Sequence, residues 1–100
     1  MTRTTLRRDE HRATRAAEII KALGHPLRLR IIAVLCDTDE HVTGLAEQLG
    51  VKHSIVSQQL RILRMQGLVE AVRANGHATY RLAEPQMRQL VACIEACSLD

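Results

Sequence analysis

The sequence predicts a mainly α-helical fold with one small β-hairpin, in the order α-α-α-α-β-β-α. Apolar residues recur at helical spacing along most of the chain, and within residues 42–67 Gly50 separates a short helix from a longer one. Two β-prone runs follow within residues 68–82, on either side of Asn75-Gly76, a pair that suits a type I′ hairpin turn because both central residues need positive φ. Two helices joined by a short turn and followed by a hairpin make a winged helix-turn-helix.

Length and composition indicate a single domain over residues 1–100 with a modest core. The chain is 46% hydrophobic but has no Phe or Trp and one Tyr, so Leu, Ile, Val and Ala must build the core. It therefore has no aromatic platform on which unpaired bases could stack, which disfavours single-stranded nucleic acids. The net charge of +3 permits a nucleic-acid partner without requiring one.

The chain contains no run of the roughly 20 apolar residues that a membrane span needs. Its polar start, Met1-Thr2-Arg3, also lacks the hydrophobic core of a signal peptide. We therefore expect a cytoplasmic protein with no membrane partner. In that reducing compartment the three cysteines are expected to be free thiols, ligands or sensors rather than a disulfide framework.

The amino-terminal part predicts an arm and two helices. Residues 1–8 are polar and basic without periodicity and are expected to form a flexible arm. A helical pattern starts at Asp9, whose charge suits a helix start, and stops at Gly24. Pro26 then opens the most apolar helix of the chain, which Cys36 closes. The charged side chains that this second helix is expected to expose are Arg28 and Arg30.

The helix-turn-helix is expected at residues 42–67, with a short helix opened by Thr43 and a longer one from about His53 to Gln66. Placed at 100° per residue, the longer helix separates into an apolar side and a polar side. Gln59 falls in the apolar arc and is expected to be a hydrogen-bonded structural amide. The polar side consists of Ser54, Ser57, Gln58, Arg61 and Arg64.

The polar side of this helix has the chemistry of a duplex reader. Glutamine can bond adenine bidentately, serine can bond base edges or phosphate, and arginine can bond guanine or phosphate. A solvated helix face is an equally good interpretation of these residues alone, but the hairpin expected at residues 68–82 favours DNA. Lys52 and His53 at the helix start and Arg73 beside the hairpin turn complete the candidate DNA-binding set.

The last predicted helix, residues 84–98, carries the apolar stripe Met87, Leu90, Val91 and Ile94. It and the first helix have too little of their own chain to pack against. The simplest solution is a two-fold homodimer built from these two helices. Such a dimer would present two recognition helices roughly 34 Å apart and would bind an inverted repeat in double-stranded DNA.

Three segments of the chain carry a series that is specific when found in this order: G-H-P-L-R-L-R-I-I-A-V-L at 24–35, V-S-Q-Q-L…L…G-L-V within 42–69, and R-A-N-G-H-A-T-Y-R-L at 73–82. Together they resemble the ArsR/SmtB family of bacterial winged-helix repressors. The resemblance implies a homodimeric repressor that leaves its operator when a metal ion or a thiol-modifying signal binds. One departure is Lys52, where similar sequences place a serine that caps the recognition helix, a bond worth about 1 kcal/mol.

The resemblance also directs attention to the positions at which family members sense their signal. Soft-metal sensors carry Cys-x-Cys where this chain has His41 and Thr43, so that thiolate site is absent. Zinc sensors carry their ligands at the positions that match Glu84, Gln86, Cys97 and Asp100, and Gln86 cannot supply the imidazole that zinc prefers. What remains is the thiol-containing branch, which senses arsenic or soft metals, or persulfides and oxidants.

Cys93 and Cys97 are four residues apart and therefore neighbours on one face of the last helix. At that spacing the Cβ atoms lie about 5–6 Å apart, farther than the roughly 3.8 Å of an unstrained disulfide. The pair suits arsenite or another soft metal(loid), or separate reaction with a third thiol, which can only be Cys36. Family members that sense persulfides or oxidants pair a cysteine near the end of the last helix, which Cys97 matches, with one in the second helix, about one turn before the position of Cys36. A buried structural role for Cys36 is the alternative. No cofactor is expected to be required for DNA binding.

Two other functions are compatible with parts of the sequence. A winged helix used only for protein contacts would not bind duplex DNA in a salt-dependent manner. A thiol-dependent enzyme is disfavoured because the chain has no phosphate-binding glycine loop, no nucleophile elbow and no paired carboxylates. Its histidines also lie scattered in the sequence, at His11, His25, His41, His53 and His77.

Overall fold

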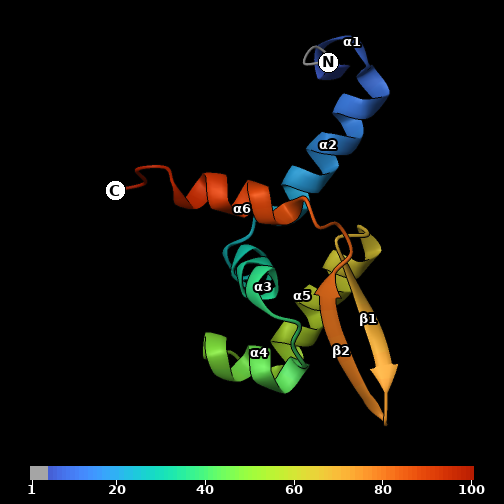
Figure 1. Cartoon of the computed structure of the whole chain (residues 1–100), viewed down its shortest axis with the longest axis vertical. Helices are drawn as coiled ribbons and strands as arrows, with labels where there is room; N and C mark the ends of the chain where they lie inside the picture. Colours follow the sequence, from blue (N-terminus) through green and yellow to red (C-terminus); the bar gives the residue numbers. More distant parts are fainter. Residues whose placement is uncertain (1–4) are drawn as a thin grey trace.

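The computed structural model describes residues 5–100 and has six helices and a two-stranded antiparallel hairpin in that range (Figure 1). This confirms the mainly α-helical winged helix-turn-helix, with one helix more than expected. The elements are α1 (Thr5–Arg8), α2 (Glu10–Leu23), α3 (Pro26–Asp37), α4 (Val42–Leu49), α5 (His53–Met65), β1 (Val69–Ala74), β2 (His77–Leu82) and α6 (Met87–Glu95).

The additional helix, α1, lies in the segment expected to be a flexible arm over residues 1–8. Residues 5–8 form one helical turn, which the Thr5 carbonyl continues by accepting the Asp9 N–H at 2.9 Å. The remainder of that expected arm, residues 1–4, lies outside the described residues. Asp9 then caps α2, because its carboxylate accepts the Arg12 N–H at 3.0 Å.

The core lies where α3, α4 and α5 meet the base of the hairpin. Pro26 occupies the first turn of α3, where its missing N–H costs no helical bond, and the His25 ring accepts the Leu27 N–H at 3.1 Å. The buried apolar residues are Ala22, Leu23, Ile31, Ile32, Leu35, Leu45, Ala46, Val56, Leu60, Leu63, Leu68, Val69, Leu82, Met87 and Val91.

The turn between α4 and α5 depends on Gly50, which has φ of 66° and ends α4 in the left-handed conformation. The preceding helix starts at Val42 with His41 as its cap residue, one residue earlier than the start expected at Thr43. After α5, Gly67 at φ of 74° reverses the chain into the hairpin. The turn of the helix-turn-helix and its carboxyl end are therefore each fixed by a glycine in a conformation that other residues rarely adopt.

The hairpin pairs Val69 with Leu82 at its base and Ala74 with His77 at its tip. Asn75 and Gly76 form the turn with φ of 54° and 79°, as a type I′ turn requires. At its base the hairpin is joined to the start of α4, because Glu40 and Tyr80 exchange two backbone hydrogen bonds of 2.8 and 3.0 Å. Figure 1 shows the hairpin at one end of the molecule and α1 with α2 projecting at the other.

The last helix, α6, covers residues 87–95 and is shorter than the helix expected over residues 84–98. Pro85 and Gln86 form a turn instead, in which the Glu84 carbonyl accepts the Met87 N–H at 3.0 Å. Beyond Glu95 every side chain is exposed, so no packing extends the helix. Within residues 5–100, no helix is long and apolar enough to cross a membrane.

Candidate nucleic-acid interface

The helix α5 has one side that is buried in the core and one side that is exposed. The buried side packs against the core through Val56, Leu60 and Leu63, whose side chains are at most 1% exposed. All five polar residues expected on the other side are exposed. The sequence of α5 includes no carboxylate, so nothing on this surface repels a phosphate backbone. The exposed polar side chains of this surface are Ser54, Ser57, Gln58, Arg61 and Arg64, and the apolar side chains of Ile55, Ile62 and Met65 are also exposed on α5.

The amino-terminal end of α5 offers backbone donors. Lys52 precedes the helix in an extended conformation, and among residues 5–100 no side chain caps this helix. The Ile55 N–H donates to the Lys52 carbonyl at 3.1 Å, so the N–H groups of His53 and Ser54 are the ones that this end of α5 can offer to an anion, which the helix dipole favours there. Lys52 and His53 are both exposed at this end. Together they place positive charge and donors where a phosphate could bind.

The hairpin brings a second group of polar side chains to the same end of α5. Arg73 pairs with Ala78 one step from the turn and is exposed. A hollow of about 200 Å³ lies between the turn and the starts of α4 and α5. The residues that line it include His41, His53 and His77, and the His41 and His77 rings lie 6.0 Å apart.

The convergence of these three histidines differs from the scattered arrangement expected from the sequence. They come from the cap of α4, the start of α5 and the start of β2, elements that only the tertiary fold brings together. The Nδ1 atom of His41 lies 3.1 Å from the Ala78 carbonyl, which connects the cap of α4 to the hairpin. No short motif could have identified this cluster, because its members are 12 to 36 residues apart.

The three cysteines lie away from the hairpin turn, on α3 and around α6. Cys93 is exposed on α6, and Cys97 follows the end of that helix, where its thiol donates to the Cys93 carbonyl at 3.3 Å. Cys36 is half-buried on α3, and its carbonyl accepts a hydrogen bond from Arg88 of α6 at 2.9 Å. In the described part of the chain, no three His, Cys, Asp or Glu side chains group as ligands for a metal ion.

Burial raises the pKa of the Cys36 thiol above its ordinary value of 9.0. The Arg88 guanidinium opposes this shift, whereas the Asp37 and Glu95 carboxylates add to it. The thiol is thus held in its protonated form at neutral pH. Cys36, Arg88 and Glu95 border a hollow of about 280 Å³ between α3 and α6.

Comparison with known proteins connects this geometry to a family. The family model described as bacterial regulatory protein, arsR family, matches residues 25–71, which run from the cap of α3 into β1. The biofilm growth-associated repressor of Xylella fastidiosa (strain Temecula1) is 39% identical over 82 residues, covering 82% of this chain and 72% of that protein. The chain belongs to the ArsR family.

Solved structures agree with this ArsR-family assignment. The crystal structure of the transcriptional repressor BigR from Xylella fastidiosa has a TM-score of 0.74 and 35% identity, covering 89% of this chain and 94% of that one. The homodimeric winged helix-turn-helix domain of Mb0332 from Mycobacterium bovis has a TM-score of 0.78 and 30% identity, covering 88% of this chain and 82% of that one. This ArsR-family protein is a DNA-binding transcriptional regulator and not an enzyme.

The matched family segment includes every candidate DNA-binding residue except Arg73, and it excludes two of the three thiols. Residues 25–71 contain Lys52, Arg61 and Arg64, together with Cys36. Cys93 and Cys97 lie beyond this segment. The family match therefore covers the whole of α5, whereas Cys93 and Cys97 must be judged on their own surroundings.

The surroundings of the thiols predict an order of reaction. At about pH 8, iodoacetamide is expected to modify Cys93 and Cys97 before Cys36, because only thiolates react and the half-buried Cys36 has a raised pKa. Raising the pH increases the thiolate fraction, so the reaction of Cys36 should accelerate most toward alkaline pH. Mass spectrometry of tryptic peptides measures both rates, because Cys36 lies between Arg30 and Lys52 and the other two cysteines follow Arg88. Equal rates at all three thiols would contradict the prediction.

Proposed function

We propose that this ArsR-family protein is a homodimeric repressor that holds an inverted-repeat operator through α5 of each protomer. The observation that carries the proposal is the exposed hydroxyl, amide and guanidinium surface of α5, whose opposite side is fixed in the core. An arrangement of this kind lets base-reading side chains enter a major groove without distorting the domain. The uncapped start of α5 and Arg73 on the hairpin add phosphate contacts on either side.

An apolar surface outside the core supports the dimer. A hollow of about 320 Å³ at the junction of α2, α3 and α6 is almost entirely apolar. Ile20 at its edge is 64% exposed, which is unusual for a residue of this size. A second copy of the chain would cover this surface and bring two α5 helices together on one side of the DNA. The residues that line the hollow are Ile20, Leu23, Gly24, Leu29, Leu90 and Ile94.

The thiols lie next to this proposed dimer surface. Cys93 and Cys97 are exposed on either side of Ile94, which lines the apolar hollow. Arsenous acid that bound both thiols would release one water molecule for each As–S bond formed. A thiolate that attacked the outer sulfur of an organic persulfide would itself become a persulfide and release the organic thiol. Either product would enlarge and reshape the end of α6, and we propose that this change weakens operator binding.

Release of an operator from the protein tests the proposal. The probe is a fluorescent duplex enriched by the wild-type protein from a randomised pool, mixed in turn with arsenite, zinc, an organic persulfide and peroxide. A coupling of about 1–3 kcal/mol would weaken binding about five- to 150-fold. We expect arsenite or the persulfide to release the probe, and expect Cys93→Ser and Cys97→Ser to retain it. Release by zinc that persists after all three thiols are replaced would contradict the sensor role of the cysteines.

A further inference from the structure

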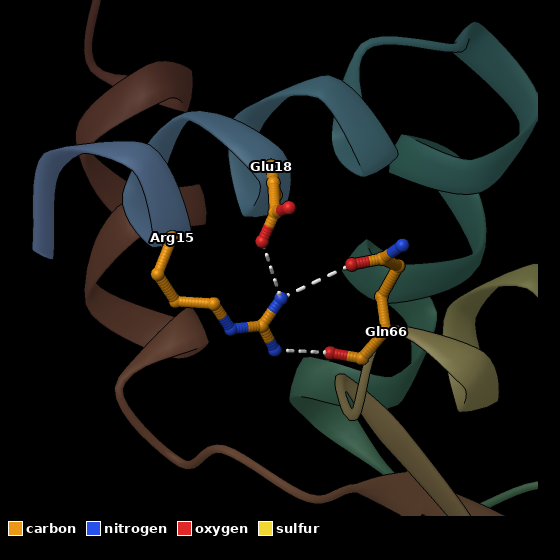
Figure 2. A network of polar contacts seen from close by, with 3 residues as sticks. All are labelled: Arg15, Glu18 and Gln66. Atoms are coloured by element: carbon orange, nitrogen blue, oxygen red, sulfur yellow. Dashed lines mark hydrogen bonds and ion pairs between the residues drawn. The ribbon is translucent and has the colours of Figure 1, made fainter. Parts of the chain in front are cut away.

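One arginine connects the helix of the proposed dimer surface to the end of the recognition helix. Arg15 of α2 donates through Nη2 to the backbone carbonyl of Gln66 at 2.6 Å and through Nη1 to the Gln66 side-chain oxygen at 3.1 Å (Figure 2). Glu18, one turn further along α2, lies 3.6 Å from the same Nη1 atom and orients the guanidinium. Arg15 and Gln66 are 51 residues apart in sequence.

Gln66 is the residue that ends α5. The last carbonyls of a helix have no partner within it and carry the negative end of the helix dipole, so a guanidinium placed there is favourable. Two residues before Gln66 stands Arg64, which belongs to the exposed polar surface of α5. Arg15 therefore holds the recognition helix at its carboxyl end, away from the bases and from the buried side of the helix.

The space between α2 and α5 explains why this contact matters. The two helices border a hollow of about 320 Å³ with a mixed lining, in which Glu18, Lys21, Arg28 and Gln66 stand beside the apolar side chains of Ala22 and Ile62. Arg28 of α3 crosses the same region and donates to the Ala22 carbonyl at the end of α2 and, at 2.9 Å, to the Gln59 side chain of α5. Arg28 is therefore half-buried and not one of the exposed charges expected from the sequence. The hydrogen bonds of Arg15 and Arg28 therefore join α2 to α5 across this hollow, in directions that the mixed lining alone does not set.

The geometry points to Arg15 as a positioning residue that sets the distance between the two recognition helices of the dimer. In the proposed repressor, on which this inference rests, α2 belongs to the dimer surface and α5 to the DNA surface. Any change in how α2 is joined to α5 therefore changes how far apart the two protomers present their recognition helices. The consequence is that Arg15 determines which spacing between operator half-sites the dimer accepts, although it contacts no base.

Selection from a randomised duplex pool separates positioning from base reading. Wild-type protein, Arg15→Ala and Gln66→Ala each select their own binding sites, and Arg12→Ala serves as the control because it removes the same charge from α2 without a side-chain hydrogen bond or ion pair among residues 5–100. We expect wild type and Arg12→Ala to enrich one half-site spacing. Arg15→Ala should enrich the same half-site bases with a broader range of spacings. Its preference for the wild-type spacing over spacings one base pair longer or shorter should fall roughly fivefold or more.

Two further measurements make the outcome decisive. Gln66→Ala removes one of the two acceptors and should broaden the range of accepted spacings in the same way but to a smaller extent. Thermal unfolding and sedimentation should show that every variant is a folded dimer. If Arg15→Ala keeps the wild-type spacing, or weakens all spacings by the same factor as Arg12→Ala, Arg15 contributes only charge and the inference is wrong. If the wild-type protein enriches no inverted repeat, the proposed function is overturned and the inference falls with it.

Discussion

Replacing Arg61 or Gln58 by alanine is expected to weaken binding to the selected operator by about 1–3 kcal/mol each. Both side chains are exposed on the polar surface of α5, where they can reach base edges or phosphates without moving the buried side of the helix. Fluorescence anisotropy of the labelled operator at several salt concentrations measures the loss. The salt series also shows whether the lost contact was to a base or to a phosphate, because loss of a phosphate contact lowers the steepness of log affinity against log salt by about 1.

Arg12→Ala is the matched control for Arg61→Ala, because it removes one arginine from α2 instead of α5. The control should bind within about twofold of wild type, as expected for an exposed charge away from the duplex. For wild type the slope should be steep and negative, at about −0.9 for each phosphate neutralised. Unchanged affinity in both α5 variants would show that this surface is not the reader. A flat wild-type slope would instead favour a winged helix that contacts only proteins.

Replacing Ile20 by glutamate is expected to convert the dimer to a monomer and to abolish tight operator binding. Ile20 is 64% exposed in one chain and stands at the edge of the apolar hollow between α2, α3 and α6. Two symmetric copies of an unpaired carboxylate would be buried in the dimer, and each costs several kcal/mol. A monomer binds only one half-site, so it loses the roughly 10²- to 10⁴-fold gain in affinity that bivalent binding gives.

Sedimentation velocity and operator titration on the same samples measure the two parts of this effect. Ile20→Leu is the control because it keeps an apolar side chain of the same volume at that position, and it should remain dimeric and bind like wild type. Because Ile20 is exposed in the single chain, neither variant should unfold the domain. If the Ile20→Glu variant remains dimeric, the protomers associate through another surface.

Features that depend on the backbone preference of one residue were predictable from the sequence. Asp9 caps α2 and Pro26 opens α3, and both act through chemistry that is local to the helix start. Gly50 ends α4 with a positive φ, and Asn75 with Gly76 forms the hairpin turn, as the requirement for positive φ indicates. The two-sided pattern of α5 likewise follows from helical periodicity alone, since its buried residues recur every three or four positions.

Features that depend on tertiary contacts were not predictable. The end of α6 could not be placed, because Cys97 and the residues after Glu95 continue an acceptable helical sequence but meet nothing that would hold it. The bond between Arg15 and Gln66 has no local signature, and a lone arginine on an exposed helix face normally indicates solvent. Arg28 was assigned to the surface for the same reason, although the end of α2 and Gln59 enclose it.

The two backbone bonds between Glu40 and Tyr80 have a mechanical consequence. They attach Glu40, two residues before α4, to the outer edge of β2, and the Glu40 carboxylate also accepts from the His41 N–H and from Gln48 of α4. Bending the wing away from the helix-turn-helix would break either the two backbone bonds between Glu40 and Tyr80 or, if Glu40 moved with the wing, the bond to Gln48. We therefore expect the wing and the helix-turn-helix to move as one unit, and in the proposed repressor an inducing signal would weaken DNA binding by changing the position of that unit relative to the helices that join the protomers.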